Sequence, residues 1–89
     1  NILRAGMVGW NKSLAGEVAA EGITCNILAP GSILTDRTVV TQGGIAAKRG
    51  VTLEEQLAER AKQIPAGRIG EAREFGPMAA FLASDHGAY

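Results

Sequence analysis

The stretch that decides the fold is Ile23–Thr35, which reads ITCNILAPGSILT. Its first part is short and almost wholly apolar, and Gly22 and Pro30-Gly31 bound it on either side. Such a run is typical of a β-strand covered on both faces, as in parallel sheets with helices above and below. Ligands in that architecture bind outside the carboxyl ends of the strands. The sequence therefore predicts a buried strand over 23–29 and a functional turn directly after it.

Helical patterns lie on both sides of this strand. Residues 1–21 carry apolar side chains every three or four positions, and Gly22 follows where a helix-ending glycine is expected. Beyond the turn, residues 36–49 are mixed and contain Gly43-Gly44, which predicts a short helix and a mobile loop. The sequence therefore alternates helix and strand, as a βαβ unit does.

The last third of the chain predicts two further helices. Thr52 and Glu55 have the spacing of a capping box and open a helix that runs to about residue 62. A turn-rich link over 65–70 leads to a helix from 71 to about 84. Pro77 lies inside that helix and lacks the N–H that a helix interior needs, so we expect a kink or a fresh start there.

Composition narrows the class of protein. The chain has 89 residues, a formal net charge of zero and one Cys. No apolar run approaches the roughly 18–20 residues of a membrane span, and a neutral chain has no electrostatic footprint for nucleic acid. A single Cys fits a reducing cytosol, and no cluster of Cys, His, Asp or Glu has the spacing of metal ligands. We expect a cytoplasmic protein that binds no metal, nucleic acid or membrane.

One buried strand cannot satisfy its own backbone N–H and C=O groups, so other strands must flank it. The pattern provides no second confident strand. We therefore expect residues 1–89 to be part of a larger α/β domain.

Several stretches together resemble the C-terminal part of a short-chain dehydrogenase/reductase. They are residues 12–15 (KSLA), 22–31 (GITCNILAPG), Thr35, 65–70 (PAGRIG) and 80–85 (AFLASD). The subgroup that they resemble most is 3-oxoacyl-(acyl-carrier-protein) reductase-like. The resemblance implies the C-terminal portion of a Rossmann-type, doubly wound parallel sheet. In that alignment the Gly-rich loop and the catalytic Ser and Tyr would precede Asn1.

The resemblance also implies an activity. The family transfers a hydride between NADP or NAD and a small carbonyl or alcohol substrate, and its members are usually homodimers or homotetramers. Residues 36–62 would form the substrate lid. A non-catalytic cofactor-binding or scaffold member of the same fold is the alternative.

Five residues are candidates for the site by this resemblance. Pro30, Gly31 and Ile33 would line the nicotinamide pocket, and Thr35 would offer a hydroxyl, although Thr35 is also placed to cap a helix that begins at residue 36. Arg4 occupies the position of the family's catalytic Lys, which holds the nicotinamide ribose. An Arg keeps the charge but has a planar, forked shape, so the exchange is not conservative. An ordinary surface Arg is the other interpretation of that position.

Overall fold

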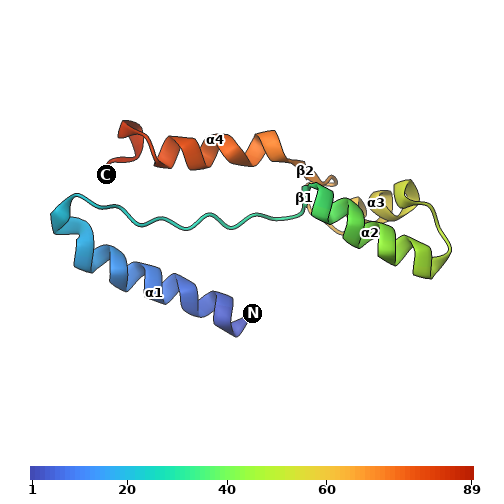
Figure 1. Ribbon diagram of the computed structural model, residues 1–89, viewed down its shortest axis with the longest axis horizontal. Coiled ribbons are helices and arrows are strands. Elements are labelled where there is room, and N and C mark those ends of the chain that lie inside the picture. The colour runs from blue at the N-terminus through green and yellow to red at the C-terminus, as the bar shows by residue number, and fades with distance from the viewer. The chain divides into compact units, whose positions relative to one another are not determined.

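The computed structural model describes residues 1–89 as four α-helices, two short strands and two 3-10 turns. In chain order they are α1 (Ile2–Val18), a turn (Ala19–Glu21), β1 (Ile33–Leu34), α2 (Asp36–Arg49), α3 (Leu53–Lys62), β2 (Gly70–Glu71), α4 (Ala72–Leu82) and a turn (Asp85–Gly87) (Figure 1). The chain divides into two compact units, Asn1–Ala29 with Met78–Tyr89 and, between them in sequence, Pro30–Pro77. None of the helices combines the length and the apolar composition that a membrane span requires.

The helix predicted over residues 1–21 is confirmed as α1 and the 3-10 turn that continues it. Gly22 ends it in the left-handed conformation, with φ of 77°, which glycine adopts without steric cost. Asn11 Nδ2 then donates a hydrogen bond of 3.2 Å to the carbonyl of Cys25. This bond ties the middle of α1 to the segment that follows it.

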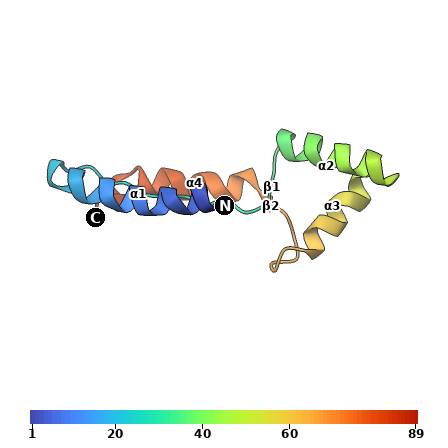
Figure 2. The same cartoon turned by 90° about the horizontal axis from the view of Figure 1, so that it is seen from below.

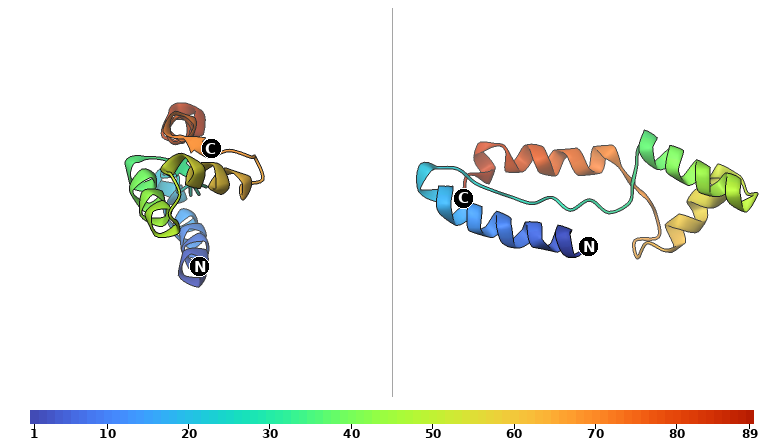
Figure 3. Two further views of the ribbon diagram at one scale, coloured as in Figure 1. Left: turned by 90° about the vertical axis from the view of Figure 1, so that its right-hand side faces the viewer. Right: turned by 60° about the horizontal axis from the view of Figure 1, so that its bottom comes forward.

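The buried strand predicted over residues 23–29 is not formed in this chain. The segment has an extended backbone (Figure 3), but none of its residues pairs with another strand. Cys25 and Leu28 are half-buried, and the other residues of the segment are exposed. A strand exists only through hydrogen bonds to a neighbour, and the one strand pair here lies elsewhere. The prediction was wrong because an apolar run indicates only that its side chains favour burial. Strand formation also requires a neighbouring strand to hydrogen-bond with the backbone.

The Pro30–Pro77 unit contains the sheet, which is a parallel pair of β1 and β2. Ile33 stands opposite Gly70, and Leu34 stands opposite Glu71. The Gly70 N–H also donates to the Ser32 carbonyl at 2.9 Å. A Cβ at Gly70 would lie 2.9 Å from Ile33 Cδ1, so the glycine leaves room for that side chain. This pairing joins the start of the unit to residues close to its end.

Residues 36–49 form one continuous helix, α2, and not the predicted short helix and mobile loop. The helix passes through Gly43 and Gly44 without a break. Each internal glycine costs roughly 1 kcal/mol relative to alanine. Both ends of the helix are capped, which stabilises it against this cost. The Thr35 side chain accepts a hydrogen bond from the backbone N–H of Thr38, and Gly50 ends the helix with φ of 68°.

The capping box predicted for α3 is confirmed. Glu55 N donates to Thr52 Oγ1 and Thr52 N donates to Glu55 Oε2, both at 3.1 Å. Helices α2 and α3 pack against each other after the turn at Gly50 (Figure 2). The two buried residues of the chain lie in this pair, Ala46 at 3% exposed and Gln56 at 8%. The small core of the unit is therefore the contact between these two helices.

The final helix, α4, continues through Pro77, so the predicted fresh start at that residue does not occur. Pro77 is the sixth of the eleven residues of α4, and its missing N–H removes one hydrogen bond from the middle of the helix. Beyond α4, Ser84 caps the second 3-10 turn, and the ring of the exposed His86 stacks on Phe81 with centroids 6.0 Å apart.

Candidate functional site

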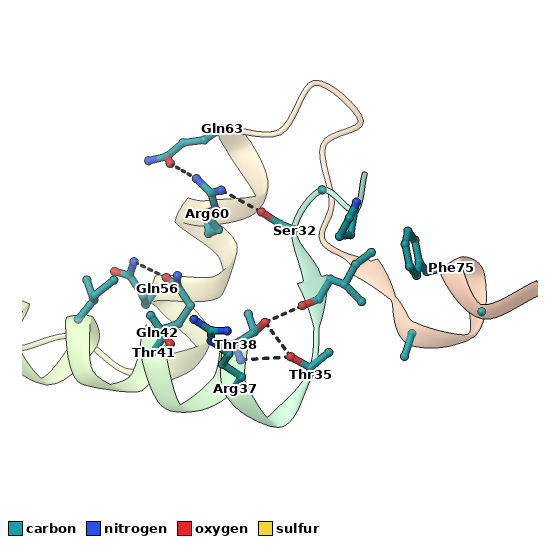
Figure 4. A pocket seen from close by; sticks show the side chains of 16 residues that line it. Ser32, Thr35, Arg37, Thr38, Thr41, Gln42, Gln56, Arg60, Gln63 and Phe75 are labelled. Carbon is teal, nitrogen blue, oxygen red and sulfur yellow. Dashed lines mark hydrogen bonds between the residues drawn. The ribbon is translucent and has the colours of Figure 1, made fainter. Parts of the chain in front are cut away.

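A cavity of about 800 Å³ opens in the Pro30–Pro77 unit (Figure 4). Its walls come from the turn that follows the extended segment, from α2 and α3, and from the start of α4. The lining residues are Pro30, Gly31, Ser32, Ile33, Thr35, Arg37, Thr38, Thr41, Gln42, Ile45, Gln56, Arg60, Gln63, Ala72, Phe75 and Gly76. Small-molecule sites commonly have volumes of roughly 300–1,000 Å³, so the cavity is of a suitable size for one.

Four of the five residues predicted for the site line this cavity: Pro30, Gly31, Ile33 and Thr35. At Gly31 an added Cβ would meet nothing within 4 Å, so the turn is open on that side. Arg4 lies on α1 in the other unit, where its side chain is exposed and makes no ion pair or hydrogen bond. The four turn residues therefore lie at the cavity, whereas the role of Arg4 in cofactor binding stays a prediction.

Thr38, which the sequence did not single out, holds the predicted residues in place. Its Oγ1 donates to the Ile33 carbonyl at 2.6 Å and lies 3.1 Å from Thr35 Oγ1 (Figure 4). Its backbone N–H donates to Thr35 Oγ1 at 3.3 Å, so Thr35 is a helix cap as expected. The spacing of two Thr residues three positions apart is the sequence signal that could have revealed this pair.

The hydrogen bonds of Thr35 and Thr38 fix which oxygen atom at this edge of the cavity donates and which accepts. A threonine hydroxyl has one hydrogen and two lone pairs. The hydroxyl hydrogen of Thr38 is directed to the Ile33 carbonyl, so Thr35 must donate in the bond between the two hydroxyls. Thr35 Oγ1 also accepts from the Thr38 N–H and keeps one free lone pair. With the second lone pair of the Ile33 carbonyl, this edge of the cavity presents acceptors and suits a ligand N–H.

Arg60 links α3 to the turn. Its guanidinium donates to Ser32 Oγ at 2.8 Å and to Gln63 Oε1 at 3.1 Å (Figure 4). Arg60 and Ser32 are 28 residues apart, and no local pattern in the sequence indicates the contact. The bond with Ser32 fixes α3 to the turn that carries Pro30 and Gly31.

Gln56 forms the second polar link, between α2 and α3. Its amide donates to Gln42 Oε1 at 2.9 Å, and its Oε1 accepts from Arg49 Nη1 at 2.5 Å. Because Gln56 is buried, these bonds satisfy an amide that would otherwise be costly to bury. The wall of the cavity formed by the two helices is therefore held by specific hydrogen bonds as well as by the contact at Ala46.

A charged contact orders the start of α4 beside the strand pair. Arg68 donates two hydrogen bonds to Glu74, at 2.7 and 2.6 Å, and Glu74 Oε2 accepts from the Glu71 N–H at 2.8 Å. The Arg68 guanidinium, and then the Glu71 N–H, lower the pKa of the Glu74 carboxyl to about 2. The same contact raises the pKa of Arg68. The pair is exposed and positions the backbone that leads into α4.

A comparison with solved structures gives the class of protein. The chain is similar to a short chain dehydrogenase family protein from Francisella tularensis subsp. tularensis SCHU S4, with a TM-score of 0.88 and 27% identity. The match covers 94% of this chain and 35% of that one. The chain thus has part of the Rossmann-type α/β fold of short-chain dehydrogenases/reductases, as predicted.

Sequence comparison gives the family. The chain matches the family described as enoyl-(acyl carrier protein) reductase over residues 1–89, and it belongs to that family. It is 48% identical to the 3-oxoacyl-[acyl-carrier-protein] reductase FabG of Haemophilus influenzae and 46% identical to the FabG of Escherichia coli K12. Each of these two alignments covers 97% of this chain and 31% of the relative, so the chain spans about a third of the relatives' length.

Proposed function

We propose that the protein is an NAD(P)-dependent oxidoreductase that reduces a 3-oxoacyl group, carried on acyl carrier protein, to the corresponding alcohol. The observation that carries the proposal is the cavity edge formed by the turn residues, in a chain 48% identical to a 3-oxoacyl-[acyl-carrier-protein] reductase. When bound, the nicotinamide supplies a hydride to the carbonyl carbon and is itself oxidised, while the carbonyl oxygen gains a proton.

The residues of the cavity edge fit a nicotinamide carboxamide. An amide NH₂ group is a double donor, and the free lone pairs of Thr35 Oγ1 and the Ile33 carbonyl are acceptors. The open side of Gly31 leaves room for a flat ring to approach the backbone, and Pro30 stiffens the turn. In this proposal these four residues orient the ring.

The proposal gives separate roles to the lid and to Arg4. Residues 36–62 form the lid over the substrate, which agrees with the many cavity residues that α2 and α3 contribute. Arg4 donates to the diol of the nicotinamide ribose in place of the family's Lys. The protein would act in the cytoplasm as a homodimer or homotetramer.

The reaction can be tested with two substrates. The full-length protein is supplied with NADPH or NADH and either a 3-oxoacyl or a 2-enoyl thioester of acyl carrier protein, and loss of reduced cofactor is followed. We expect reduction of the 3-oxoacyl substrate only. Reduction of the enoyl thioester alone would overturn the choice of reaction and favour the chemistry in the family's description. Cofactor binding with neither reaction would favour the non-catalytic alternative.

Variants at Arg4 test the assigned role. Arg4→Ala removes a charge-assisted hydrogen bond worth about 1.5–3 kcal/mol, so we expect cofactor affinity to fall on the order of tenfold to a hundredfold. Arg4→Lys keeps the charge and should retain turnover. Arg73→Gln, which changes an exposed arginine paired with Glu71, is the control. Unchanged cofactor affinity in Arg4→Ala would show that Arg4 is a surface residue.

A further inference from the structure

The charge of the cavity is not balanced. Two of its lining residues are arginines, Arg37 and Arg60, and none is Asp or Glu. The chain as a whole has nine basic and nine acidic residues, so this concentration is local. Cavities lined by one sign of charge focus the electrostatic potential and concentrate ligands of the opposite sign. The cavity therefore favours an anion.

Arg60 is positioned to bind such a group. It is half-buried, and the bonds to Ser32 Oγ and Gln63 Oε1 fix its orientation without neutralising its charge, since both acceptors are neutral. A guanidinium has five N–H donors, so three remain after these two bonds. A pre-oriented guanidinium with free donors matches the planar geometry of a carboxylate or phosphate.

Arg37 makes no contact that would stabilise the Pro30–Pro77 unit. It is exposed, makes no hydrogen bond or ion pair, and is the second residue of α2. Cations near a helix N-terminus are unfavourable because that end carries partial positive charge. Asp36, the neighbouring acidic residue, is in the favourable position for the helix but does not line the cavity. A residue that breaks a local rule without a compensating contact is a candidate for function.

The rest of the lining suits an organic chain attached to the anion. Ile45, Ala72 and Phe75 contribute apolar surface, while Thr41, Gln42 and Gln63 contribute uncharged polar groups. A ligand with an apolar segment and one oxyanion would use both kinds of surface. A purely apolar ligand would leave both guanidiniums without an anionic partner.

We propose that Arg37 and Arg60 select carbonyl substrates that carry an oxyanion, a carboxylate or a phosphate, and that they bind this group directly. The reaction itself rests on the proposed function above, whereas anion binding by the two arginines does not. Arg37 is the leading test residue because its replacement disturbs no contact within the fold.

The test compares two substrates that differ in one charge. The full-length protein and its Arg37→Gln variant are assayed with acetoacetate and with its neutral methyl ester. We expect kcat/KM for acetoacetate to fall about tenfold to a hundredfold in Arg37→Gln, as for a lost charge-assisted bond, and kcat/KM for the ester to change less than about twofold. Arg60→Lys keeps the charge but loses the fork, and we expect a smaller loss with the same preference. Arg73→Gln is the control, since Arg73 is exposed and does not line the cavity.

Two binding measurements separate the possible failures. Calorimetric titration with acetoacetate should show weaker binding in Arg37→Gln even if the parent reduces neither compound, and that result would support anion recognition while refuting the reaction. Equal losses for acetoacetate and the ester, together with weaker NADPH binding, would assign the arginines to the cofactor phosphates and overturn the proposal. An unchanged preference between acid and ester would also overturn it.

Discussion

The Thr38 hydroxyl lies 2.6 Å from the Ile33 carbonyl oxygen and joins the first turn of α2 to the strand before it. Through the same oxygen Thr38 accepts from Thr35, so one side chain fixes the hydrogen-bonding state of two residues predicted to contact the cofactor. Thr38 therefore determines which hydrogen-bond acceptors Thr35 and Ile33 offer to a ligand, although Thr38 itself does not need to touch that ligand.

Replacing Thr38 by Val should therefore weaken both the fold and cofactor binding. The shape is kept and one hydrogen bond to the Ile33 carbonyl is lost, so we expect the free energy of unfolding to fall by about 0.5–1.5 kcal/mol. The Thr35 hydroxyl also loses its acceptor, and cofactor affinity should fall several-fold. Urea unfolding and fluorescence titration with NADPH measure the two effects. Thr41→Val, one turn later on α2 and without a side-chain hydrogen bond, should leave stability nearly unchanged.

Gln56→Ala should loosen the packing between α2 and α3. The substitution leaves the half-buried Gln42 amide and the exposed Arg49 guanidinium without their partner, and each lost hydrogen bond typically costs about 0.5–1.5 kcal/mol. We expect faster amide hydrogen exchange across α2 and α3 in the full-length protein, and slower exchange of residues 36–62 when cofactor and substrate bind. Lys48→Ala, at an exposed position on α2 where the side chain makes no hydrogen bond or ion pair, is the control. Exchange in Gln56→Ala equal to that of the control would argue against the link.

Glu74 should titrate far below an ordinary glutamate. Its pKa is lowered from 4.5 to about 2, so the ionised carboxylate stabilises the fold above pH 4.5 and this contribution is lost as the pH falls toward 2. Carbon-13 NMR of the side-chain carboxyl follows the titration directly. Arg68→Gln should raise the pKa while the Glu71 N–H still holds it somewhat below its usual value. A midpoint near 4.5 in the parent protein would show that the ion pair does not form in solution.

Gly87 should tolerate no side chain. A Cβ there would lie 2.5 Å from the Leu82 carbonyl oxygen and 2.8 Å from its Cα, and backbone atoms cannot move away as a side chain can. Overpacking of this kind costs about 1–3 kcal/mol, so Gly87→Ala should lower the melting temperature. Gly44→Ala is the opposite control, because a Cβ inside α2 meets nothing within 4 Å. It should raise stability by about 0.5–1 kcal/mol.

Local chemistry explains which parts of the fold could be predicted. The capping box of Thr52 and Glu55 and the helix end at Gly22 depend on residues within one or two turns, and both are confirmed. Gly43-Gly44 misled the prediction because the low helix propensity of glycine was weighed without the packing of α2 on α3, which involves residues distant in the sequence. The strand over 23–29 was misjudged for the related reason that pairing is a property of two segments.

The candidate site also contains residues that could be predicted from the local sequence and residues that could not. The turn residues Pro30 and Gly31 could be predicted because a parallel sheet places ligands after its strands, and the cavity lies there. Arg60 could not be predicted, since its contact with Ser32 spans 28 residues and depends on how α3 folds back. Side chains that complete a site from distant segments leave no periodic trace in a single sequence.

The pairing of β1 with β2 has a consequence for engineering. Ile33 pairs with Gly70 and Leu34 pairs with Glu71, so residues near the start of the Pro30–Pro77 unit are hydrogen-bonded to residues near its end. The two ends of the segment are therefore held together by contacts within the segment itself. Neither junction, Ala29–Pro30 or Pro77–Met78, interrupts β1 or β2, but the second lies inside α4, so the segment can be exchanged only with a relative that continues this helix in the same register. Chimeras that exchange residues 30–77 with those of a relative would transfer the whole cavity wall in a single step.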